Sequence, residues 1–170
     1  RDVYKRQIVW KGLSVKQTVL FLLLHCYAVP SCGKIPAMKH PSMTRLVLGI
    51  DPGLASTGYG LVESAGSRLC YITHGVIETS SKAPHPERLL TIFREITAVI
   101  EHYSPSEAGM ETLYFAKNVS SAMGVAEARG VVTLALALHG IPLGEFTPHG
   151  IKQAVVGAAR AEKRQVQECV

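Results

Sequence analysis

The feature that most constrains the fold is a short apolar segment that ends in one acid and a tight turn. Residues 45–51 read RLVLGID, and Pro52-Gly53 follows directly. A run of this length and apolar character is typical of a strand buried on both faces of a sheet. Asp51 therefore stands at the carboxyl end of a predicted central strand, where binding sites gather in open α/β sheets.

The rest of the domain predicts strands and helices in alternation. Turn residues separate the early strands, and apolar residues at helical spacing mark the helices. The order predicts an α/β fold with a mixed five-stranded sheet flanked by helices on both faces. The predicted elements are strands at 45–51, 57–62 and 69–79, a helix at 85–103, a strand at 107–111, a helix from Ser120 or Ser121 to about His139, a strand at 142–146, a helix at 148–156 and a helix that starts at Ala161.

Residues 1–42 differ in character from the remainder of the chain. They hold seven Lys/Arg and one acid, a net charge of +6, whereas residues 43–170 hold 11 Lys/Arg and 12 Asp/Glu, a net of −1. The apolar run at 19–24 resembles a secretory signal peptide, for which cleavage near Ser31 would be expected. The start without Met and the lack of periodicity favour another interpretation. We expect a non-native or unstructured leader at 1–42 and one domain at 43–170.

Composition limits the function classes only weakly. The net charge of +5 does not by itself indicate nucleic-acid binding, because the basic excess belongs to residues 1–42. None of the four cysteines stands in a CxxC pair, and no histidine spacing completes a zinc site. Scattered reduced thiols in a cytoplasmic protein are the expectation.

Two acids stand where predicted strands end. Asp51 closes the strand at 45–51 and Glu111 closes the strand at 107–111. If these strands are neighbours, both carboxylates can bind one divalent metal such as Mg²⁺, which prefers oxygen ligands. The alternative is that Asp51 caps the Pro-Gly turn and Glu111 is a solvated loop acid. For each acid taken alone, that alternative is the stronger one.

Five segments in order resemble motifs of the RuvC-type Holliday-junction resolvases, a family with a ribonuclease H-like fold. The resemblance runs from about Leu46 to Val170. Its segments are GIDPG with TGYG (49–53, 57–60), Glu111 with YFAKN (114–118), AEARG (126–130), KQAVVG (152–157) and AEK with QVQ (161–163, 165–167).

The resemblance implies a homodimeric endonuclease that resolves four-way DNA junctions in recombination and repair by symmetric, metal-dependent phosphodiester hydrolysis. Asp51 and Glu111 would be catalytic ligands to Mg²⁺, with two ions per subunit in the complete protein. A RuvA–RuvB type branch-migration complex is an expected partner, and no membrane is expected. Tyr114 would stack on a base. The residues expected to contact DNA are Tyr114, Lys117, Asn118, Lys152 and Lys163.

The alanine-rich helix near 122–138 is the expected dimer surface, with a role in the subunit's own core as the alternative. His149, at a predicted helix start, is expected to be a polar cap residue without a catalytic role.

The sequence departs from the family at one point. The family carries two further Asp on a C-terminal helix, but no Asp follows Asp51 here. We therefore expect a domain that is incomplete at its C-terminus, with weak or absent cleavage by this chain. The main alternative is a catalytically inactive module of the same fold that binds branched nucleic acid. A second alternative is an ATP-binding protein of the actin and Hsp70 type, which shares the Asp-x-Gly turn.

Overall fold

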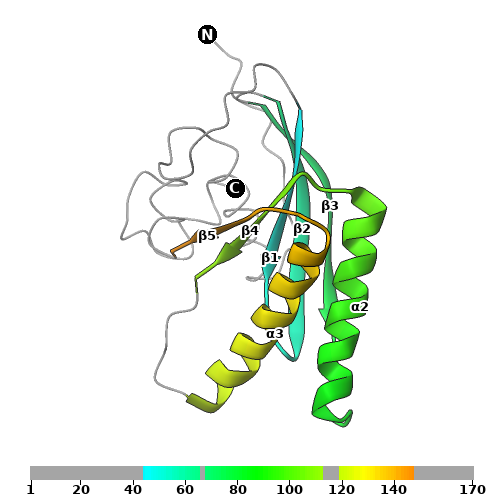
Figure 1. The fold of residues 1–170 in the computed structure, drawn as a ribbon, viewed down its shortest axis with the longest axis vertical. Coiled ribbons are helices and arrows are strands. Elements are labelled where there is room, and N and C mark those ends of the chain that lie inside the picture. The colour runs from blue at the N-terminus through cyan, green and yellow to red at the C-terminus, as the bar shows by residue number, and fades with distance from the viewer. Residues whose placement is uncertain (1–43, 66–67, 113–118, 148–170) are drawn as a thin grey trace, which may run out of the picture.

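The structure, a computed structural model, describes residues 44–65, 68–112 and 119–147. Within these ranges the chain forms one sheet and two long helices (Figure 1). The expected leader at 1–42 and the predicted helices at 148–156 and from Ala161 lie outside the described residues. The elements are β1 (Arg45–Asp51), β2 (Ser56–Ala65), β3 (Arg68–Glu78), α2 (His85–Tyr103), β4 (Glu107–Glu111), α3 (Val119–Leu138) and β5 (Leu143–Phe146).

The predicted elements within these ranges are confirmed, and most boundaries agree within a residue. β2 is the exception, because it continues past the predicted end at residue 62 to Ala65. Glu63 and Ser64 interrupt the apolar pattern there, yet they pair with Cys70 and Leu69 of β3. The long hairpin between β2 and β3 therefore extends further than apolar periodicity alone indicates.

The sheet has the strand order β3-β2-β1-β4-β5. The pairs β1–β2 and β2–β3 are antiparallel, whereas β1–β4 and β4–β5 are parallel. The predicted mixed five-stranded sheet is thus confirmed. Since β1 and β4 are parallel neighbours, their carboxyl ends meet at the same edge of the sheet.

Both described helices pack on one face of the sheet. Figure 1 shows α2 and α3 side by side against the strands. The buried residues between these layers come from every described element except β5, which adds the partly buried Leu143. The other two predicted helices, at 148–156 and from Ala161, lie outside the described residues. The main core residues are Leu48, Ile50, Leu61, Ile77, Ile92, Ile96, Ile100, Ala108, Met110, Ala128, Val132, Ala135 and Leu136.

Helix α3 buries small and larger apolar side chains on one face and exposes three large apolar side chains elsewhere. Ala128 and Ala135 are fully buried in the core, so for them the alternative of a core role is confirmed. Met123, Leu134 and Leu138 are 62%, 54% and 65% exposed. The dimer surface stays a prediction, and on this helix it falls to these larger apolar residues. No helix of the described residues is long and apolar enough to cross a membrane.

Candidate functional site

Asp51 and Glu111 end neighbouring parallel strands. Ile50 pairs with Met110 in the ladder between β1 and β4, so the next residues, Asp51 and Glu111, stand abreast at its end. Neighbouring strands are separated by about 4.8 Å, and residues side by side in a ladder direct their side chains to the same face. Both acids are half-buried. The predicted pairing of the two carboxylates is therefore what the strand register produces.

The acids face away from α2 and α3. Ile50 and Met110 belong to the core under these helices, and side chains alternate along a strand. Asp51 and Glu111 consequently point to the opposite face. On that face, four buried glycines from four strands form a row two residues before the acids, where another group can approach the backbone closely, and Phe146 of β5 pairs with Glu111 beside it. The paired row is Gly60, Gly49, Gly109 and Gly144.

The turn after Asp51 is fixed by buried hydroxyls. Thr57, which is fully buried, donates from Oγ1 to the carbonyl oxygen of Gly53 at 2.9 Å and accepts from the Gly53 N–H at 3.2 Å. The hydroxyl of Thr79 donates to the carbonyl oxygen of Leu54, and Arg88 of α2 donates to that hydroxyl at 2.9 Å. These bonds tie the turn to β2, β3 and α2, which limits movement of the Asp51 backbone.

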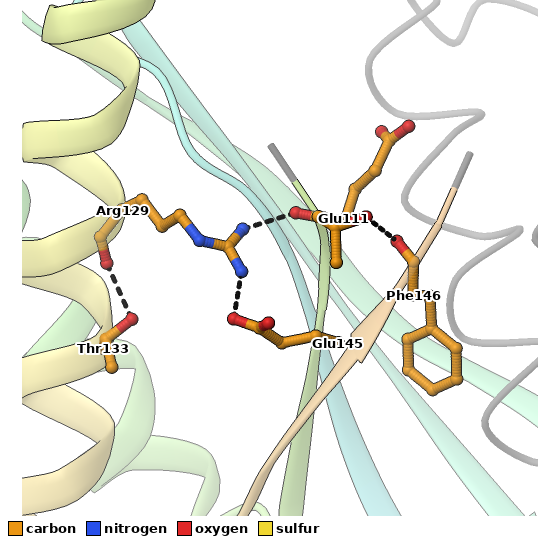
Figure 2. Close-up of polar contacts among 6 residues, drawn as sticks. Glu111, Arg129, Thr133, Glu145 and Phe146 are labelled. Carbon is orange, nitrogen blue, oxygen red and sulfur yellow. Dashed lines mark hydrogen bonds and ion pairs between the residues drawn. The ribbon is translucent and has the colours of Figure 1, made fainter. Parts of the chain in front are cut away.

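The end of β4 is fixed by a second set of bonds, which Figure 2 shows. Thr112 donates from its N–H to the carbonyl oxygen of Phe146 at 2.8 Å and from its hydroxyl to the same oxygen at 3.1 Å. Arg129 of α3 donates through Nη1 to the main-chain oxygen of Glu111 and through Nη2 to the carboxylate of Glu145. The backbone of Glu111 is thereby tied to β5 and α3.

Tyr59, in the glycine-rich motif that follows the turn, lies on the helix side of the sheet and not beside the acids. It is partly buried against the core and occupies the space above Gly75 of β3. Burial, followed by the nearby Tyr103 and Glu95, raises the pKa of its phenol above the ordinary 10.0. Tyr59 is therefore a neutral packing residue that supports β2.

The donor chemistry at this edge fits a hard divalent cation. Two carboxylates about one strand spacing apart supply the oxygen ligands that Mg²⁺ prefers, and such a site keeps several waters. In the part of the chain that the structure describes, no group of three or more His, Cys, Asp and Glu side chains gathers as a metal site. Asp51 and Glu111 are the described residues whose placement suits two ligands of such a site.

The other predicted site residues cannot be placed. Tyr114, Lys117 and Asn118 fall in 113–118, and Lys152 and Lys163 fall in 148–170, all outside the described residues.

Four residues that hold the two strand ends were not predicted from the sequence. They are Thr57, Thr79, Thr112 and Arg129. Arg129 stands in the AEARG segment, but its partners lie 18 and 16 residues away and only the fold brings them together.

Comparison with known proteins identifies close relatives. The profile of the family described as "Crossover junction endodeoxyribonuclease RuvC" matches residues 47–170. The RuvC protein of Treponema denticola is 57% identical over 134 residues, which is 79% of this chain and 75% of the relative. That of Treponema pallidum is 51% identical over 129 residues, 76% of this chain and 66% of the relative.

A solved structure agrees with these matches. Thermus thermophilus RuvC in complex with a Holliday junction substrate superposes with a TM-score of 0.71 at 30% sequence identity. The match covers 74% of this chain and 77% of the RuvC chain. Its fold is the one that the strand order and helix placement show here.

Proposed function

The chain belongs to the RuvC family of crossover junction endodeoxyribonucleases, and from that membership we propose that the protein resolves Holliday junctions by metal-dependent hydrolysis of DNA phosphodiester bonds. The main supporting observation is the register of β1 and β4, which brings Asp51 beside Glu111 at the ends of parallel neighbouring strands. The family match over 47–170 favours the nuclease over the ATP-binding alternative.

Asp51 and Glu111 are the proposed catalytic metal ligands. Each supplies anionic oxygens from a strand end whose backbone is held by the bonds to Thr57, Thr79, Thr112 and Arg129. Bound Mg²⁺, two ions per subunit in the complete protein, supplies activation of water and stabilisation of the leaving oxygen. The protein's own contribution is to hold the two carboxylates at neighbouring strand ends, next to the row of four glycines.

DNA contacts are assigned to residues outside the described ranges. We propose that Tyr114 stacks on a base and that Asn118 and three lysines hold backbone phosphates. Residues 113–118 and 148–170 contain five Lys/Arg and two Asp/Glu, whereas the described ranges contain six Lys/Arg and ten Asp/Glu. This distribution supports the assignment. The lysines are Lys117, Lys152 and Lys163.

A homodimer, a four-way junction and a RuvA–RuvB type branch-migration complex complete the proposed set of partners. The exposed apolar side chains of α3 support the dimer, because three large ones, Met123, Leu134 and Leu138, stand on one helix. The proposed location is the cytoplasm.

The test uses the complete gene product on a synthetic four-way junction with Mg²⁺. We expect paired, symmetric nicks that Asp51→Asn and Glu111→Gln each reduce at least about 100-fold, since each removes an anionic metal ligand. Binding of the junction in EDTA should survive in both variants. Tight binding without nicks by the unsubstituted protein would instead indicate an inactive branched-DNA-binding module.

A further inference from the structure

We propose that Arg129 is a positioning residue that sets the metal affinity of the site through the backbone of Glu111. The inference rests on the proposed role of Glu111 as a metal ligand. The observation behind this proposal is that the guanidinium of Arg129 donates both to the main-chain oxygen of Glu111 and to the carboxylate of Glu145.

The direction of approach is what makes this contact suited to a metal site. Arg129 reaches Glu111 from the α3 side, whereas the Glu111 side chain points away from the guanidinium in Figure 2. A guanidinium on the carboxylate itself would compete with a cation for the oxygens. On the carbonyl it fixes the residue while its positive charge stays on the far side of the strand from the metal ligands.

The contact is built to be rigid. The Arg129 side chain is only 16% exposed, and its planar group makes two bonds to acceptors on two strands. Thr133 donates to the carbonyl oxygen of Arg129 at 2.8 Å, so the next helical turn is also constrained (Figure 2). α3, the end of β4 and β5 are thereby joined at the residue that carries one of the two carboxylates.

The stability of an ion pair does not account for this arrangement. Glu145 is 52% exposed, and pairs of that exposure contribute little because water screens them. Metal sites, in contrast, are sensitive to the groups that orient their ligands, and loss of such a group commonly lowers metal affinity or activity by about 10- to 100-fold. The expected effect of Arg129 therefore lies in metal binding.

The chain offers a matched control. Arg45 makes a 3.0 Å ion pair with Glu107 at the opposite end of β4, far from the carboxylates along the strand. Arg45→Gln and Arg129→Gln make the same chemical change at the two ends of one strand. Only the second touches the backbone of a proposed metal ligand.

The experiment measures Mg²⁺ affinity without DNA, by calorimetry on the complete gene product, and then the Mg²⁺ concentration for half-maximal nicking. Arg129→Gln should raise the Mg²⁺ dissociation constant and this concentration by about 10- to 100-fold, and Arg129→Lys by less, since one ammonium cannot serve both acceptors. Arg45→Gln should leave both unchanged. Junction binding in EDTA should be equal in all four proteins.

Equal Mg²⁺ affinity in Arg129→Gln and Arg45→Gln would overturn the proposal. If Arg129→Gln does not fold, Arg129→Lys decides, and wild-type Mg²⁺ affinity in that variant would overturn it. Failure of the proposed function gives a different result. If Glu111 is not a metal ligand, Glu111→Gln should match the unsubstituted protein in both Mg²⁺ affinity and junction nicking.

Discussion

At the scale of single residues, Gly75 shows how closely one side chain depends on the absence of another. A Cβ built on Gly75 would lie 2.7 Å from Cε1 of Tyr59 and closer still to Cζ and Oη. The whole ring would have to move, and it is packed against the core. The space above Gly75 is therefore part of the packing that seats the glycine-rich strand β2.

We expect Gly75→Ala to lower the free energy of unfolding by about 1–3 kcal/mol, the usual effect of overpacking. Gly130→Ala is the control, because nothing lies within 4 Å of a Cβ there and alanine favours a helix by up to about 1 kcal/mol. Urea denaturation of both variants measures the difference. Equal stability of Gly75→Ala and the parent would contradict the tight contact.

At the scale of elements, α3 combines a buried apolar face, which includes Val132 and Leu136, with exposed apolar side chains. Leu134→Glu and Leu138→Glu should each shift a dimer toward monomer by about 10-fold or more in dissociation constant, because they place a charge in the proposed interface. Sedimentation at several concentrations measures this. Leu90→Glu on α2, where the leucine is 44% exposed, is the control and should leave the association unchanged. Loss of dimer in Leu90→Glu but not in the α3 variants would place the interface on α2 instead.

The elements were predictable from the sequence for a local reason, and their connections were not. Apolar periodicity is decided within a few residues, which is why α2 and β4 match their predicted bounds. The same pattern predicts that Asp51 and Glu111 end strands, whereas the adjacency of β1 and β4, which pairs the two acids, is a property of the fold. The bond from Arg129 to Glu111 depends on the path of α3 across the sheet, and no local pattern encodes it.

At the scale of the whole molecule, acidic and basic residues are distributed unevenly along the chain. The described ranges carry six Lys/Arg against ten Asp/Glu, so they repel phosphate overall, and within 43–170 the excess of basic residues lies in 113–118 and 148–170. Attraction to DNA must then come from a few lysines. Such contacts contribute affinity through counterion release, which makes binding dependent on salt.

Lys152→Gln and Lys163→Gln should each weaken junction binding at low salt and reduce the slope of log affinity against log salt by about 1. The measurement is a fluorescence binding titration at several salt concentrations in EDTA, which prevents cleavage. Arg94→Gln, on the exposed side of α2, is the control. An unchanged slope in both lysine variants would remove them from the DNA contact.

The register between β1 and β4 couples the burial of the core to the placement of the two acids. Sliding β4 by one residue would turn Met110 out to the other face and bring Glu111 into the apolar layer under the helices, because side chains alternate along a strand. A misaligned chain would lose core burial and the carboxylate pair in the same step. Burial of Met110 under the helices therefore excludes the one-residue slips that would turn the Glu111 side chain away from that of Asp51.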